Sequence, residues 1–142
     1  MNEVKLRILT ESDLEFLLEI RNHETTKQFL WNTSYFGLQE CKEWYSELQW
    51  PWYIIENELG EKVGYLRTNG DEVGCDIHMK YRRMGYARQA YVEYLKDKEF
   101  ARLYVLETNF AKNLYESLGF KETGNFVEPD DRGKHLEMIW KK

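Results

Sequence analysis

The sequence predicts an α+β domain built on a mixed, mainly antiparallel sheet of about six to seven strands flanked by helices. Short runs of alternating apolar and polar residues recur along the chain, and runs with helical spacing separate several of them. The dipeptide Asn69–Gly70 joins two strand-like runs and is typical of a tight hairpin. With 142 residues the chain fits a single domain, residues 1–142, that can bury a core without metals or disulfides.

The first half of the chain is expected to form a strand, two or three helices and a three-stranded meander. Val4–Leu9 alternates as a strand, and Thr10 with Asp13 makes a capping pair for the helix that follows. The further expected elements are a short helix near 23–29, a helix at 38–49 ended by Pro51, and strands at 52–57, 62–68 and 72–79.

The second half alternates strands and helices. A helix is expected at 86–97, a strand at 102–107, a helix at 110–118, and two strands at 120–126 and 135–140. The pattern is continuous and contains no repeat or low-complexity segment, which favours a single domain over a modular chain.

Composition excludes several classes of function. The net charge of −5 disfavours nucleic acids and anionic membranes as partners, because both attract basic surfaces. Cys41 and Cys75 have no metal-ligand spacing, so we expect no metal and a reducing compartment. The chain starts without the apolar core of a signal peptide and has no run near the ~20 apolar residues of a membrane span. We therefore expect a cytoplasmic protein.

One segment departs from this acidic background. Residues 80–88, "KYRRMGYAR", place four cations and a glycine between a strand-like and a helix-like run. The first turn of a helix presents unpaired N–H groups and the positive end of its dipole, so this turn predicts an anion site. A dinucleotide site is the weaker alternative, because it needs three glycines and a parallel sheet.

The stretch "RRMGYA" (Arg82–Ala87) resembles the acetyl-CoA pyrophosphate loop of the GNAT superfamily of N-acyltransferases, with its Arg/Gln-x-x-Gly-x-Gly/Ala pattern. "NFAKNLYESLGF" (Asn109–Phe120) is similar to a second segment of that family, and the order of elements agrees along the whole chain. The resemblance implies acetyl-CoA as co-substrate. The residues that it assigns to the cofactor are Ile77, Met79, Arg82, Arg83, Met84, Gly85, Tyr86, Ala87, Arg88 and Asn109.

Two positions depart from the family's pattern. Arg83 stands where a glycine is frequent, and Asn109 precedes Tyr115 by six positions where the family usually shows seven. The second departure leaves the cofactor contact of Asn109 open; the same side chain is also placed to cap the helix that follows.

Acyl transfer to an amine requires a base, an oxyanion donor and an acid. Glu72 is the expected base, with Asp76 and His78 as alternatives on the same strand. The resemblance places the oxyanion donors at the N–H groups of Ile77 and Met79, and it makes Tyr115 the acid that protonates the departing thiolate. We expect Cys75 to pack as a small apolar side chain rather than act as a nucleophile.

The acceptor is the open question. Stretches of the first half resemble a GNAT branch of nucleotide-linked amino-sugar acetyltransferases and, more loosely, ribosomal-protein N-terminal acetyltransferases. The expected acceptor residues are Arg21, Asn22, Trp31, Tyr35 and Arg67. Three functions stay open: an amino-sugar or other small-molecule acetyltransferase, a protein N-terminal acetyltransferase, and a non-catalytic acyl-CoA-binding module. The sequence also leaves the acyl chain length and the oligomeric state undetermined, a dimer included.

Overall fold

The computed structural model describes residues 3–30 and 34–142, and it contains every helix and strand that the sequence predicts. The described strands are β1 (Lys5–Ile8), β2 (Tyr53–Glu56), β3 (Lys62–Asn69), β4 (Glu72–Ile77), β5 (Phe100–Leu106), β6 (Lys121–Val127) and β7 (His135–Lys141). The described α-helices are α1 (Leu14–Arg21), α2 (Glu24–Lys27), α3 (Leu38–Ser46), α4 (Tyr86–Leu95) and α5 (Ala111–Ser117). Short 3-10 turns precede α1 and follow β4.

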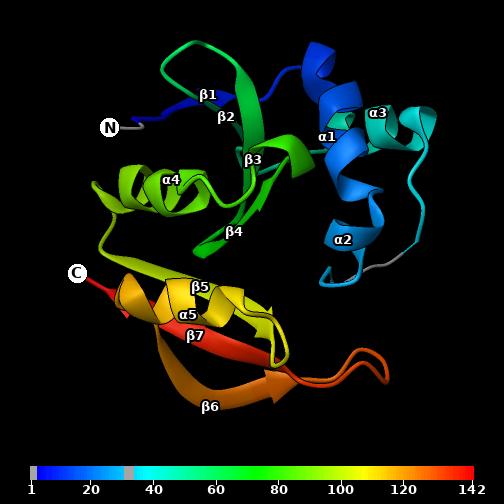
Figure 1. Ribbon diagram of the computed structural model, residues 1–142. Helices are drawn as coiled ribbons and strands as arrows, with labels where there is room; N and C mark the ends of the chain where they lie inside the picture. Colours follow the sequence, from blue (N-terminus) through cyan, green and yellow to red (C-terminus); the bar gives the residue numbers. More distant parts are fainter. Residues whose placement is uncertain (1–2, 31–33) are drawn as a thin grey trace.

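The strands form one seven-stranded sheet in the order β1-β2-β3-β4-β5-β7-β6, which confirms the expected α+β class. Neighbouring strands run antiparallel, except that β4 and β5 are parallel. In the described chain β4 pairs with β5 only at Glu72 and Arg102, so the two strands diverge toward Ile77. Figure 1 shows the resulting gap between the upper half of the sheet, β1 to β4, and the lower half, β5 to β7.

Helices cover the two faces of the sheet differently. One apolar cluster joins α4 and α5 to strands of both halves, and its most buried members include Tyr91, Phe120 and Met138. A second cluster packs α1 and α3 on the opposite face, through Leu14, Ile20 and Cys41 against β2 and β3. The gap between β4 and β5 therefore lies between α4 and α5 on one face and α1 and α2 near the other (Figure 1).

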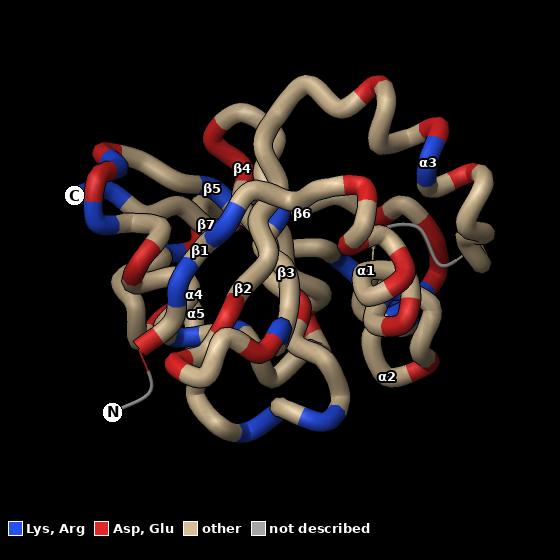
Figure 2. The backbone as a smooth tube through the Cα atoms, turned by 90° about the horizontal axis from the view of Figure 1, so that it is seen from above, with Lys and Arg blue, Asp and Glu red and all other residues tan. Residues whose placement is uncertain are grey.

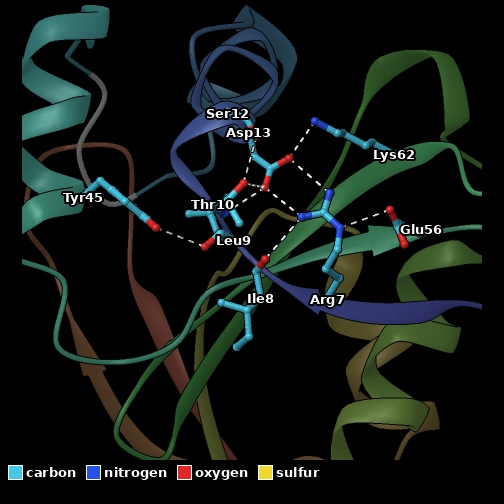
Figure 3. A network of polar contacts seen from close by, with 9 residues as sticks. All are labelled: Arg7, Ile8, Leu9, Thr10, Ser12, Asp13, Tyr45, Glu56 and Lys62. Atoms are coloured by element: carbon cyan, nitrogen blue, oxygen red, sulfur yellow. Dashed lines mark hydrogen bonds and ion pairs between the residues drawn. The ribbon is translucent and has the colours of Figure 1, made fainter.

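A buried carboxylate fixes the start of α1 to the sheet. Asp13 accepts hydrogen bonds from the backbone N–H of Thr10 at 2.8 Å and from Arg7 at 2.9 Å, and Lys62 lies 2.6 Å away (Figure 3). Burial acts to raise the pKa of Asp13, but the hydrogen bonds from Arg7, Lys62 and Thr10 outweigh it and hold that pKa well below its usual range. The predicted pairing of Thr10 with Asp13 is thus confirmed, and it anchors the start of α1 to the sheet.

None of the helices in the described parts of the chain has the length and apolar content needed to cross a bilayer.

Candidate active site

The basic turn enters α4 through a left-handed glycine. Gly85 precedes the first residue of α4 with φ at 83°, a left-handed conformation that glycine adopts without strain. Arg83 also has a positive φ, 64°. A Cβ at Gly85 would meet nothing within 4 Å, so the space above the first turn of α4 is open. Unpaired N–H groups and the helix dipole can therefore act on an anion placed there.

The side chains of this turn have different tasks. Arg82 donates to the carbonyl of Ile77 at 3.0 Å and to the hydroxyls of Thr25 and Thr26 on α2, the latter at 2.5 Å. Arg82 therefore holds the loop against β4 and α2. Its guanidinium is used in these contacts, and this supports a structural role more than the expected contact with the cofactor. Arg83 and Met84 are exposed beside the open space.

The first turn of α4 contributes mainly backbone. The side chain of Tyr86 is buried in the apolar cluster, and Arg88 donates to the hydroxyl of Ser117 on α5 at 2.7 Å. Ala87 has no polar side chain. Of the cofactor residues predicted in this helix, only the N–H groups at 86–88 and the charge of Arg88 are placed to act on an anion.

A cleft of about 590 Å³ occupies the gap between β4 and β5, and we call it the wedge cleft. It runs from Arg82 and Arg83 past Ile77 to Tyr115. Asn109 also lines it, although its side-chain oxygen accepts from the N–H of Ala111 at 2.9 Å and so takes part in capping α5. The cleft thus connects the anion loop with the predicted proton donor.

Tyr115 projects from α5 into a cluster of aromatic rings. Its hydroxyl accepts a hydrogen bond from Tyr91 at 3.5 Å, and its ring lies edge-on to the rings of Tyr91 and Phe120. Burial raises the pKa of Tyr115 to about 12, although the hydrogen bond from Tyr91 acts to lower it. The phenol is therefore protonated at neutral pH and able to donate, but it is a weak acid.

The end of β4 presents one N–H group, that of Ile77, toward the wedge cleft. The N–H of His78 donates to Val63 on β3 at 2.8 Å. Because N–H groups alternate between the two sides of a strand, that of Ile77 points toward β5, which has already diverged. Met79 lies past the end of the strand, in the 3-10 turn, so this alternation does not extend to it.

The three candidate bases have different surroundings. Glu72 lines two cavities described below, and no hydrogen bond or ion pair to its carboxylate occurs among the described residues. Asp76 is ion-paired with Arg67 at 2.6 Å. His78 contacts Glu19 at 2.6 Å and lines none of the cavities on this side of the sheet. Glu72 therefore lines two cavities with a carboxylate that has no partner among the described residues, whereas Asp76 lines the wedge cleft itself.

Cys75 packs against the apolar cluster on the other face of β4, as the sequence predicts. Burial raises the pKa of its thiol, so it is not an ionised nucleophile.

Two further cavities adjoin the wedge cleft. A middle cavity of about 210 Å³ is lined by Arg21, Phe29, Leu30, Trp52, Tyr65, Arg67, Glu72, Tyr104 and His135. A tryptophan cavity of about 450 Å³ contains Trp44, Trp50 and Trp52 together with Glu47 and Glu72. Arg67 lines all three spaces. They follow β4 from the wedge cleft at Ile77 back to the start of the strand at Glu72.

Acidic residues border this side of the molecule. Helices α1 and α3 each carry two carboxylates and one cation, and Figure 2 colours acidic positions red and basic positions blue along the backbone. Their field favours the approach of a positively charged group.

The expected acceptor residues divide into three groups. Arg21 and Arg67 line the middle cavity. Asn22 hydrogen-bonds the backbone of Phe36 in both directions, at 2.8 and 3.0 Å, and so holds a loop; Tyr35 is 72% exposed and lines none of the three spaces. Trp31 lies outside the described residues.

Sequence reasoning missed Tyr104 and His135, which line the middle cavity from β5 and β7. His135 is buried, and burial lowers its pKa, so its imidazole is neutral at pH 7. Neither residue belongs to a local motif. Only the pairing of β5 with β7 brings them to the cavity that Glu72 also lines.

Comparison with known proteins identifies a family and structures of the same fold. The sequence matches the model of the acetyltransferase (GNAT) family over residues 14–120. Spermidine N-acetyltransferase from Vibrio cholerae, solved with CoA and spermine, is 20% identical with a TM-score of 0.84, covering 96% of this chain and 94% of that one. A domain from Methanocaldococcus jannaschii is 23% identical with a TM-score of 0.82, covering 100% of both chains. No curated protein sequence matches significantly.

Proposed function

The chain belongs to the acetyltransferase (GNAT) family of acetyl-CoA-dependent N-acetyltransferases, and we propose that it acetylates a primary amine of a small molecule by direct attack through a tetrahedral intermediate. The observation that carries this proposal is the continuity of the wedge cleft from the basic turn before α4, at Arg82 and Arg83, to the half-buried phenol of Tyr115. The end at the basic turn suits a diphosphate because it offers cations and N–H groups, and the end at Tyr115 suits a thioester because it offers a proton donor.

Acetyl-CoA would bind with its diphosphate at the first turn of α4. The N–H groups at 86–88 and the cations of Arg83 and Arg88 supply the positive field there. Phe110, which is 87% exposed at the wall of the wedge cleft, offers an apolar surface to the rest of the cofactor. The pantetheine arm then lies along β4, with the thioester near Ile77.

The reaction needs three groups around that thioester. Glu72 takes a proton from the incoming ammonium, and the neutral amine attacks the carbonyl carbon. The N–H of Ile77 stabilises the oxyanion, with Met79 as the second predicted donor. Tyr115 then protonates the sulfur as the C–S bond breaks.

Replacing Glu72 by Gln should slow turnover on the order of 10²-fold at pH 7, because the amine loses its proton acceptor. The deficit should shrink as the pH rises toward the pKa of an alkyl amine, about 10, since more of the amine is then already neutral. The measurement is the ratio of wild-type to variant kcat/KM between pH 7 and 9.5. Glu58→Gln, on an exposed turn, is the matched control. A ratio that does not change with pH would remove Glu72 from the role of base.

A nucleotide-linked amino sugar is the first acceptor that we propose. The indole rings of the tryptophan cavity offer surfaces for a base, and Trp50 is 49% exposed there. Arg21 lines the adjoining middle cavity, where a diphosphate needs a cation. Arg67 lies in the same cavity, ion-paired with Asp76 at 2.6 Å. Arg21, which donates to the backbone carbonyl of Ser34 at 2.9 Å, is the residue on which the anionic acceptor is tested.

A cationic amine such as a polyamine is the second candidate. Glu47 and Glu72 line the tryptophan cavity together with three indole rings, and both carboxylates and indole faces attract ammonium groups. The Vibrio cholerae protein of the same fold is a spermidine N-acetyltransferase. The cavities contain both arginines and glutamates, so they support an anionic and a cationic acceptor as the two candidates.

Thiol release from acetyl-CoA, measured against nucleotide-linked amino sugars, spermidine, amino acids and peptides, separates these candidates. For a sugar nucleotide, Arg21→Ala should raise the acceptor KM more than tenfold and leave the acetyl-CoA KM unchanged, because binding is lost at one site only. For spermidine the same variant should leave the acceptor KM equal or lower. Activity on peptide N-termini alone would replace both candidates by a protein N-terminal acetyltransferase.

A further inference from the structure

Arg67 reaches its partner across a position that has no side chain. In the register of β3 and β4, Arg67 is opposite Gly74, whereas Asp76 is opposite Tyr65. The Arg67 guanidinium nevertheless lies 2.6 Å from the Asp76 carboxylate. Its side chain therefore runs diagonally over Gly74 to the next position on the same face of β4.

The space for that path exists only because residue 74 is glycine. A Cβ there would lie 2.4 Å from Cζ of Arg67, 2.5 Å from Nη2 and 2.7 Å from Nε. The backbone gives no other reason for glycine, since Gly74 is not among the residues with positive φ. Gly74 is thus a seat for a guanidinium rather than a flexible point of the strand.

The seat places a cation at the junction of the three cavities. Arg67 lines the wedge cleft together with Tyr115, and the middle cavity together with Glu72. The other titratable groups that act on Tyr115 are Tyr91 on α4 and Cys75 and Asp76 on β4. Arg67 supplies the positive charge of this group and Asp76 fixes its position.

We infer, on the premise that Tyr115 is the proton donor, that Gly74 seats Arg67 as a positioning residue whose charge favours transfer of the Tyr115 proton to the departing thiolate. In that step the C–S bond of the tetrahedral intermediate breaks with its electron pair on sulfur. The sulfur takes the proton of the Tyr115 hydroxyl, which leaves a phenolate. The phenolate regains a proton from the new amide nitrogen, which must lose one.

The pKa values of the phenol and of a thiol explain why proton transfer from Tyr115 to the thiolate needs assistance. Burial raises the pKa of Tyr115 to about 12, whereas a thiol has a pKa of about 8.5, so the transfer is unfavourable without assistance. The hydrogen bond from Tyr91 and, after it, the charge of Arg67 act in the opposite direction and lower the pKa of Tyr115, whereas the charge of Asp76 acts to raise that pKa. Removing the charge of Arg67 should make the phenol a still weaker acid.

A double-mutant cycle tests the coupling, with saturating acetyl-CoA and the panel amine that gives the fastest thiol release. Arg67→Gln should lower kcat on the order of tenfold without changing the acetyl-CoA KM, and it should cause no further loss in the Tyr115→Phe background. Arg67→Lys, which keeps the charge, should retain most of the turnover. Independent losses in the double variant would overturn the inference. Wild-type turnover in Tyr115→Phe alone would instead overturn the role of Tyr115 in the proposed function.

Gly74→Ala tests the seat itself. The strand backbone accepts alanine, and the atoms in conflict belong to the end of a flexible side chain, so the variant should fold with the guanidinium displaced. Its kcat should fall as in Arg67→Gln, and the same change should have no effect on kcat in the Arg67→Gln background. A folded Gly74→Ala variant with full turnover would show that the seat has no role in the reaction.

Discussion

Gly85→Glu should abolish the binding of acetyl-CoA. The variant places a side chain and a negative charge in the open space at the first turn of α4, where the diphosphate is expected. Wild-type protein should be stabilised by about 2.7 kcal/mol at a ligand concentration one hundred times Kd, with a matching rise in Tm. The variant should show no rise at any concentration of acetyl-CoA. Thermal melts with and without acetyl-CoA measure both results.

The chain offers a matched control for this experiment. Gly60, in the turn between β2 and β3, has φ at 79° and, like Gly85, no atom within 4 Å of an added Cβ. Gly60→Glu therefore introduces the same charge and the same backbone strain away from the cleft. It should lower the Tm without ligand about as much as Gly85→Glu does, and keep the full rise with acetyl-CoA. Equal responses of the two variants to acetyl-CoA would show that the loop at Gly85 does not hold the diphosphate.

The features that sequence could predict are those encoded within a few neighbouring residues. Alternation along β3 and β4, the Asn69–Gly70 turn and the pairing of Thr10 with Asp13 each need only a short stretch, and each is found. The start of α4 at Tyr86 was predictable for the same reason, because a helix start after a basic turn is a local pattern.

Contacts between distant segments were not predictable. Arg82 belongs to a recognisable motif, yet its guanidinium is bound by Thr25 and Thr26, more than fifty positions earlier. Gly74 resembles any strand glycine until the register places Arg67 over it. His135 enters the middle cavity only because β7 inserts between β5 and β6. The residues that line the middle cavity thus depend on topology, which no local stretch of sequence encodes.

Tyr115→Phe should reduce turnover on the order of 10²-fold or more, because the departing thiolate loses its proton donor. The ring remains, so its edge-on contacts with Tyr91 and Phe120 should persist and the Tm should change little. Acetyl-CoA should still raise the Tm, since the diphosphate loop is unaltered. A loss confined to kcat therefore separates proton donation from packing, the other role that the aromatic cluster gives this ring.

The control for Tyr115 is a phenol in the same core but away from the cleft. Tyr94 on α4 packs in the same apolar cluster as Tyr115 and does not line the wedge cleft. Tyr94→Phe should keep wild-type turnover, which excludes a general sensitivity of this core to loss of a hydroxyl group. Because Tyr115 must be protonated to donate, its contribution should persist at neutral pH and decline only as the pH rises toward its raised pKa of about 12. If a folded Tyr115→Phe variant turns over as fast as the Tyr94→Phe control, Tyr115 is a packing residue, and the thiolate leaves without a proton from α5.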